Sequence, residues 1–180
     1  LVVNAFNRLK LPLLIVGDGP ERSSLESFAG PTIKFLGLQT MNQVEGLMEH
    51  CRAYVYAGIE DFGIAPVEAM AAGAPVIGFG CGGLLDTVRC AAKGVACPTG
   101  VLFPKQTVSS LVDAIIWFEE RKLWKELSSE SIRVWAERFR PEVFASSFET
   151  ALRLAWQKHQ ISCAVASSDP EDLSAFHEWD

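Results

Sequence analysis

Short aliphatic runs alternate with amphipathic stretches along most of this chain. The aliphatic runs are too brief for helices and are bounded by proline or glycine, so they predict buried strands. They occupy residues 12–19, 32–37, 53–58, 75–80 and 101–103. Because helical patterns separate these runs, the sequence predicts an α/β fold with a doubly wound parallel sheet of about five strands and C-terminal helices.

The helical patterns differ in how clearly their ends are marked. Residues 1–9 have apolar side chains at helical spacing with no capping residue ahead of them, as expected of a chain cut inside an element. A second helix is expected from about Pro20, with Leu25 and Phe28 turned inward. Thr40 and Gln43 have capping-box spacing, which predicts a helix start there.

Four further helices are expected after residue 65. Residues 66–73 are apolar on nearly every side, so this short helix is expected to be buried. The other three patterns span residues 108–116, residues 123–135 and the residues after Pro141. We assign residues 1–160 to one domain and expect residues 161–180, which lose periodicity and turn acidic, to form a mobile tail.

Charge and cysteine content narrow the functional classes. The net charge of −6 gives no basic surface, so nucleic acid is not an expected partner. No apolar run approaches the ~20 residues that span a bilayer. The five cysteines are odd in number and unpaired in spacing, which favours reduced thiols and a cytoplasmic location. The three histidines lack ligand spacing, so no metal site is expected.

The most informative stretch is residues 59–83, where Glu60 and Asp61 stand at the start and Glu68 follows in a small, apolar run. In a doubly wound sheet, ligands bind beyond the carboxyl ends of the strands, where loops meet helix N-termini. The expected helix would direct free N–H groups at that crevice, a natural seat for phosphate. Gly63 would allow close approach of the backbone.

These carboxylates also have a purely structural interpretation. Glu60 and Asp61 can complement the helix dipole, and Glu68 can cap its own first turn. For Asp61 we prefer that interpretation. For Glu68 we do not, because a carboxylate on a buried helix needs several partners, which sugar or ribose hydroxyls or backbone N–H groups could supply.

Two glycine-rich segments, GDGP at residues 17–20 and GFGCGG at residues 78–83, match only part of a dinucleotide-binding fingerprint. A tight turn explains each of them. A nicotinamide-dependent enzyme resting on GFGCGG stays open as a third hypothesis.

Taken together, the motifs resemble the C-terminal, donor-binding half of a family-4 retaining glycosyltransferase with the two-domain GT-B fold, whose halves are Rossmann-like. The resemblance covers residues 1–160 and rests mainly on EDFGIAPVEAMAAGAPVIGFGCGG, with LLIVGDGPE, IKFLG and TGVLF in the usual order. The segments EDFGIAPVEA and KQTV are similar to the corresponding segments of the mannosyltransferase-like branch of this family.

The resemblance implies a role for each site residue. Glu60 would contact hydroxyls of the transferred sugar and is the candidate catalytic residue. The backbone of Phe62, Gly63 and Ile64 would hold the sugar and diphosphate, and Glu68 would bind the ribose. The remaining two candidates, which would border the nucleobase, are Gly17 and Leu38. No metal or other cofactor is implied, since members of this family are generally metal-independent.

The sequence departs from the family pattern in three ways. Ala57 and Gly58 replace a proline-serine pair, and Asp86 replaces a glutamate. Three parts of the family pattern would lie upstream of Leu1. They are the Arg and Lys that clamp the donor diphosphate, the first and central strand of the donor domain, and the acceptor-binding N-terminal domain. Absence of the central strand would leave its two neighbours unpaired or let them close up. We therefore expect this chain to be marginally stable and inactive alone.

The leading hypothesis is thus the donor-binding part of a glycosyltransferase that moves a hexose, with retention, from a nucleotide diphosphate sugar to an unknown sugar or lipid-linked acceptor. The full-length protein could also associate peripherally with a membrane. An alternative is a non-catalytic sugar-nucleotide binding module that pairs with a separate subunit bearing the acceptor domain.

Overall fold

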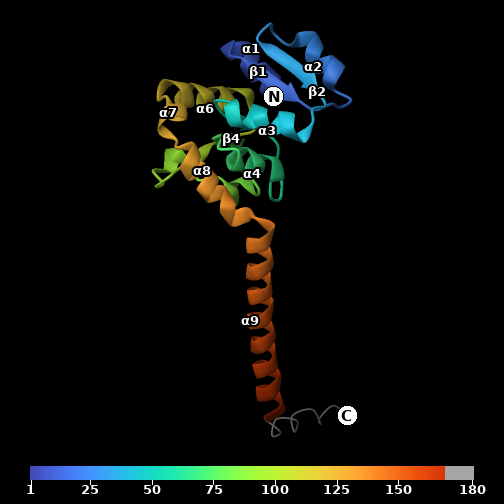
Figure 1. Cartoon of the computed structure of the whole chain (residues 1–180), viewed down its shortest axis with the longest axis vertical. Helices are drawn as coiled ribbons and strands as arrows, with labels where there is room; N and C mark the ends of the chain where they lie inside the picture. The colour runs from blue at the N-terminus through green and yellow to red at the C-terminus, as the bar shows by residue number, and fades with distance from the viewer. Residues whose placement is uncertain (169–180) are drawn as a thin grey trace, which may run out of the picture. The chain divides into compact units, whose positions relative to one another are not determined.

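The computed structural model describes residues 1–168, apart from the side chains of residue 93 and residues 163–168. This part of the chain divides into two compact units, Leu1–Glu137 and the residues from Arg138 onward. The elements (Figure 1) are α1 (Val2–Leu9), β1 (Leu13–Val16), α2 (Arg22–Phe28), β2 (Ile33–Gly37), α3 (Met41–His50), β3 (Tyr54–Tyr56), α4 (Ile64–Ala71), β4 (Val76–Phe79), α5 (Leu84–Thr87), η1 (Ala91–Lys93), β5 (Gly100–Phe103), α6 (Val108–Glu120), α7 (Leu123–Glu126), α8 (Ser129–Ala136), η2 (Glu137–Phe139) and α9 (Pro141–Ser168).

All strand pairs in the first unit are parallel, as predicted, and strands alternate with helices. The strands form two sheets, one with the order β1-β2 and one with the order β3-β4-β5. The sequence predicted that absence of a central strand would leave its two neighbours unpaired or let them close up. The first outcome holds, since β1 and β3 belong to different sheets and each has an open edge.

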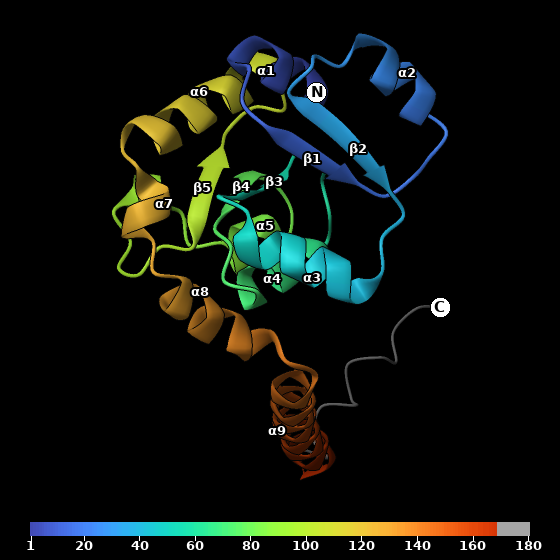
Figure 2. The ribbon, with the colours of Figure 1, turned by 45° about the horizontal axis from the view of Figure 1, so that its top comes forward.

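One hydrophobic core extends across both sheets. Its buried members come from α1, β2, the strands β4 and β5, and the helices α4 to α8. The largest fully buried side chains include Phe103, Phe118 and Met70. Helix α1 packs against β2 and α6, and α6 packs against β4 and β5, so these two helices link the two sheets (Figure 2). Helix α4 packs against α8.

The expected starts of two helices agree closely with the structure. The Thr40 side chain accepts a hydrogen bond from the Gln43 N–H, and the Gln43 side chain accepts one from the Thr40 N–H, so the predicted capping box is present. Helix α9 begins at the predicted Pro141. These two motifs are local, which is why spacing alone identified them.

Three predictions about helices need correction. Phe28, expected to face inward, is 43% exposed, and only Leu25 of that pair packs against the core. The helix expected over residues 123–135 is divided into α7 and α8, because the Ser128 side chain caps a new start by accepting from the Ser131 N–H. Helix α4 is not buried on every side: Ile64 is 68% exposed, and Glu68 is exposed too.

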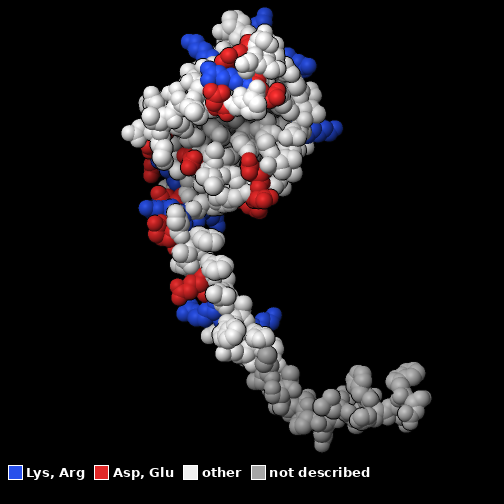
Figure 3. All heavy atoms as spheres, turned by 90° about the vertical axis from the view of Figure 1, so that its right-hand side faces the viewer, with Lys and Arg blue, Asp and Glu red and all other residues white. Residues whose placement is uncertain are grey.

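Helix α9 forms most of the second unit and is a single helix with few charged side chains (Figure 3). Its aromatic and aliphatic residues at four-residue spacing are exposed in the described structure, and they are Phe144, Phe148, Leu152 and Trp156. The boundary predicted at residue 160 lies inside this helix, and residues 169–180 of the predicted tail lie outside the described residues. None of the helices within residues 1–168 combines the length and hydrophobicity needed to cross a membrane.

The open edges make a prediction for hydrogen exchange. In parallel pairing the N–H groups of a strand point alternately to its two sides. The N–H groups of Leu13 and Tyr54 point inward to Thr32 O at 3.0 Å and to Pro75 O at 2.8 Å, so those of Leu14 and Val55 point to the open edges. We expect the latter two amides to exchange with solvent roughly tenfold faster or more. Equal protection of all four amides in an NMR exchange experiment would show that another strand pairs there.

Candidate functional site

The candidate site lies at the carboxyl ends of β3 and β4 (Figure 2). Residues 57–63 connect β3 to α4, and residues 80–83 connect β4 to α5. Because the two strands are parallel neighbours, both loops leave the same edge of the sheet. This edge carries Glu60, Phe62 and Gly63 on the first loop.

The two loops are held together by close contact of their backbones. The Gly83 N–H donates to Glu60 O at 2.8 Å. A Cβ atom at position 83 would lie 2.5 Å from Phe62 O, and a Cβ at position 82 would meet Glu60 O. Gly82 also has φ +59, in the left-handed region that favours glycine. Glycines 82 and 83 are therefore needed to seat the loop that carries Glu60.

The Glu60 carboxylate is held by a tyrosine at the end of β3. The Tyr56 hydroxyl donates to Glu60 Oε1 at 2.7 Å. Burial of the phenol, its hydrogen bond to Glu60 and the negative charge of Glu60 raise the pKa of Tyr56 to about 12. The hydroxyl therefore keeps its proton at neutral pH and can donate to the carboxylate.

A second side chain fixes the other end of the same loop. The Gln106 Nε2 group, from the segment between β5 and α6, donates to Ala57 O at 2.8 Å. The loop is thus attached to the loops that follow both β4 and β5. This lateral support restricts its movement at the carboxyl edge of the sheet.

Helix α4 starts directly after this loop and presents unpaired donors. Gly63 occupies the N-cap with φ 86, a left-handed conformation, and no side chain caps the helix. The N–H groups of Ile64 and Ala65 have no partner within the helix, and Pro66 has no N–H. The helix dipole adds partial positive charge at this end, so an anion is favoured here.

Glu68 lies on the exposed face of α4, one helical turn after Ile64. The desolvation argument that singled it out is therefore wrong, since an exposed carboxylate needs no buried partners. The Glu68 carboxylate is accessible to solvent. Its charge, together with burial of the phenol, raises the pKa of Tyr54, with burial the larger cause.

Each of the two glutamates lies near a tyrosine of β3. Tyr54 and Tyr56 are two residues apart on this strand, so their side chains point to the same face. Tyr56 contacts Glu60, and Tyr54 is affected by the charge of Glu68. The structure thus places the two carboxylates, which are separated by seven residues in the sequence, near neighbouring tyrosines on one face of β3.

Gly17 and Leu38 lie at the carboxyl ends of β1 and β2, on the other sheet of the same unit. Gly17 has φ +110, and its N–H donates to Gly37 O at 2.8 Å. Leu38 is 80% exposed. All seven predicted site residues therefore lie at carboxyl ends of strands or in the first two turns of α4.

The glycines of GFGCGG have a structural role. The backbone of residues 60–62 occupies the space beside Gly82 and Gly83. A pyrophosphate could therefore not approach these two glycines in the way that a dinucleotide fingerprint requires. This removes the observation on which a nicotinamide-dependent enzyme rested. The described residues also contain no group of three or more His, Cys, Asp or Glu side chains that could hold a metal ion.

Sequence reasoning missed Tyr56 and Gln106. An aromatic residue in a strand is ordinarily a core residue, and nothing in the spacing of Tyr56 marks its hydroxyl as a partner of Glu60. Gln106 joins a loop 49 residues away in sequence, so only the tertiary structure shows its contact with Ala57.

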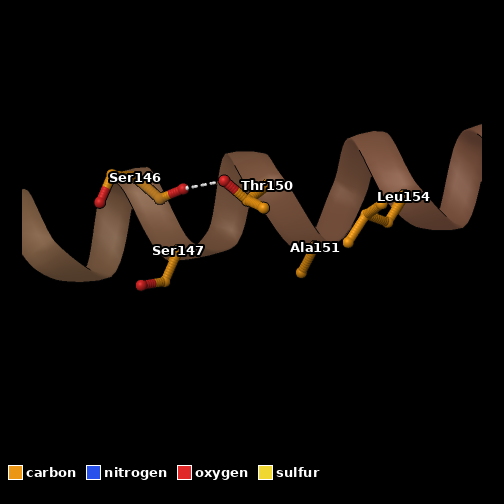
Figure 4. Close-up of a pocket in the computed structure, with 5 residues that line it drawn as sticks. All are labelled: Ser146, Ser147, Thr150, Ala151 and Leu154. Carbon is orange, nitrogen blue, oxygen red and sulfur yellow. Dashed lines mark hydrogen bonds between the residues drawn. The ribbon is translucent and has the colours of Figure 1, made fainter.

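A shallow depression on α9 carries no comparable chemistry (Figure 4). All of its lining residues belong to α9, and they are Ser146, Ser147, Thr150, Ala151 and Leu154. The Thr150 hydroxyl already donates to Ser146 O at 2.9 Å. We assign no binding function to it.

Comparison with known proteins agrees with this geometry. Residues 1–134 match the family described as glycosyl transferases group 1. N-acetyl-alpha-D-glucosaminyl L-malate synthase of Bacillus anthracis is 29% identical over 158 residues, which are 83% of this chain and 40% of that protein. The 2-deoxystreptamine glucosyltransferase of Streptomyces kanamyceticus is 35% identical over 107 residues, which are 56% of this chain and 28% of that protein.

Solved structures show the same fold at low sequence identity. Sucrose-phosphate synthase of Thermosynechococcus elongatus matches with a TM-score of 0.63 and 21% identity, over 86% of this chain and 49% of that one. Anabaena HepE in complex with UDP-glucose matches with a TM-score of 0.62 and 20% identity, over 86% of this chain and 44% of that one. Both share the α/β fold of this chain, which supports the Rossmann-like assignment.

The chain spans less than half the length of these relatives. The family match, in contrast, covers most of the chain, from residue 1 to residue 134. It includes the two loops and the helix start that form the candidate site. On this evidence the chain belongs to the group 1 family of glycosyl transferases.

Proposed function

We propose that this chain is the donor-binding part of a glycosyltransferase that uses a nucleotide diphosphate sugar. One observation carries the proposal: Glu60 stands in the loop before an α4 N-terminus that has no side-chain cap, and Glu68 lies on the exposed face of the same helix. Carboxylates accept hydrogen bonds from sugar hydroxyls, and helix amides bind phosphate. The site therefore combines the two kinds of group that a sugar diphosphate requires.

Each residue has a distinct role in this proposal. Glu60 binds hydroxyls of the transferred hexose, and Glu68 binds the ribose. The backbone of Phe62, Gly63 and Ile64 holds the sugar and diphosphate. The surfaces at Gly17 and Leu38 border the base. Several neighbours were solved with UDP or a UDP-sugar, which makes uridine nucleotides the first to test, followed by GDP-mannose for the mannosyltransferase-like branch.

The transfer itself requires more than this unit provides. We propose that hexose transfer proceeds with retention, by positioning and stabilisation of the departing diphosphate, without a metal ion. The acceptor, a sugar or lipid-linked sugar, is bound by another domain. The isolated chain is accordingly inactive; transfer or hydrolysis of a sugar nucleotide by the chain alone would contradict this.

Donor binding is the first prediction of the proposal. We expect weak, saturable binding of at least one of UDP-glucose, UDP-N-acetylglucosamine and GDP-mannose, measured by saturation-transfer NMR. Because amides and carboxylates suffice, EDTA should leave the affinity unchanged. If none of the three nucleotide sugars binds, the proposed function is wrong.

Conservative variants of the two glutamates separate their roles. A hydrogen bond to a charged group contributes about 1.5–3 kcal/mol, so each Glu→Gln change should weaken its contact by roughly tenfold or more. Glu68→Gln should weaken both the nucleotide sugar and its free nucleoside diphosphate. Glu60→Gln should weaken only the nucleotide sugar. Glu149→Gln, an equal charge change on α9, is the control and should alter neither.

The contact of Gly82 and Gly83 with the backbone of residues 60–62 can be tested by a substitution that leaves the charge of the site unchanged. A Cβ at position 83 would meet the backbone of Phe62 at 2.5 Å, so Gly83→Ala should displace the loop and abolish detectable donor binding. Gly46→Ala is the matched control, because a Cβ at position 46 meets nothing within 4 Å, and alanine favours the helix. Equal donor binding by the Gly83→Ala variant would refute the role of this contact.

A second candidate function rests on α9. Its apolar side chains, including Phe144 and Trp156, are exposed in the described structure, which is typical of an interaction surface. The chain could therefore be a non-catalytic sugar-nucleotide binding module that pairs with a subunit bearing the acceptor domain. Purification of a stable complex with such a subunit would favour this candidate, and a single longer polypeptide that carries both domains would exclude it.

A further inference from the structure

Glu60 is fixed by the protein at both its backbone and its carboxylate. Its carbonyl oxygen accepts from the Gly83 N–H at 2.8 Å, and its Oε1 atom accepts from the Tyr56 hydroxyl at 2.7 Å. A glutamate side chain on a surface loop ordinarily samples several rotamers. Here the tyrosine removes much of that freedom and leaves Oε2 available as an acceptor.

The chain between the two residues is shaped around the tyrosine ring. A Cβ atom at position 58 would lie 2.9 Å from Tyr56 Oη and 3.0 Å from Cζ. Gly58 therefore allows the loop to fold over the phenol, and the Gln106 contact with Ala57 O holds the loop there. Two features thus favour the folding of this loop over the Tyr56 phenol, in addition to the hydrogen bond itself. They are the absence of a side chain at position 58 and the contact of Gln106 with Ala57 O.

We propose that Tyr56 is a positioning residue, which orients the Glu60 carboxylate toward the hexose of the bound donor and so contributes to the recognition of the sugar. This inference rests on the proposed function for its ligand. Its geometric part, the hydrogen bond between Tyr56 and Glu60, stands independently of that function.

The two roles of the carboxylate oxygens are chemically compatible. The phenol donates one hydrogen bond to Oε1, and a sugar hydroxyl donates another to Oε2. Partial burial, followed by the hydrogen bond to Glu60 and its negative charge, keeps the phenol protonated, with its pKa raised to about 12. Tyr56 therefore acts as a donor throughout the neutral range and does not itself ionise.

Tyr56→Phe is the sharpest variant, because it removes the hydroxyl and keeps the ring that packs against the core. The ligands are the best-binding nucleotide sugar among UDP-glucose, UDP-N-acetylglucosamine and GDP-mannose, and its free nucleoside diphosphate. We expect the affinity for the nucleotide sugar to fall roughly five- to tenfold, while the affinity for the nucleoside diphosphate stays unchanged. A purely structural role would weaken both ligands together.

Tyr54→Phe is the matched control on the same face of β3. Among the residues that the structure describes, Tyr54 makes no hydrogen bond to either glutamate, so its hydroxyl should not affect the sugar. Wild-type affinity of Tyr56→Phe for the nucleotide sugar, or equal losses in the two tyrosine variants, would overturn the positioning role.

A spectroscopic measurement tests the geometry without any ligand. The chain has two tyrosines, so tyrosine labelled with ¹³C at Cζ gives two signals, and the Tyr54→Phe variant assigns them. Glu60→Gln should shift the Tyr56 signal at neutral pH and leave the Tyr54 signal nearly unchanged. An unmoved Tyr56 signal would refute the inference. A shifted signal in a protein that binds no nucleotide sugar would instead refute the proposed function and leave the hydrogen bond between Tyr56 and Glu60 standing.

Discussion

The site depends on the contact between the backbone of residues 60–62 and the glycines at positions 82 and 83. Two loops from neighbouring strands can approach this closely only where one of them has no side chains. The hydrogen bond from the Gly83 N–H to Glu60 O then fixes the separation. This single constraint places Glu60 at the sheet edge and sets the direction in which α4 begins, so it determines where the free amides of the helix point.

The electrostatics of the site differ from those of a buried catalytic centre. Both glutamates are exposed to solvent, and within the part of the chain that the structure describes neither forms a salt bridge. The contribution of Glu60 comes from orientation, because the Tyr56 hydroxyl donates a hydrogen bond to its carboxylate. An uncapped helix start beside this residue supplies the attraction for phosphate. A polar, rigid rim of this kind suits a ligand that is itself polar along its whole length.

Much of the fold was predictable from local patterns. Short aliphatic runs located the strands, and the Thr40 and Gln43 capping box located a helix, since these signals depend on neighbouring residues alone. The separation of the sheets was foreseen as one of two outcomes. The exposure of Glu68 was not, because α4 is apolar in composition and only its packing against α8 shows which face is covered. Tyr56 was missed because a hydrogen bond across a folded loop leaves no trace in sequence periodicity.

Backbone amide chemical shifts, recorded with and without the best-binding nucleotide sugar, test the central claim directly. A donor seated at the α4 N-terminus should shift the amide signals of Phe62, Gly63 and Ile64 most strongly, with smaller changes at Gly17 and Leu38 and none along α9. If the signals of residues 60–68 stay fixed while the ligand binds, the contact between the two loops does not build a donor site.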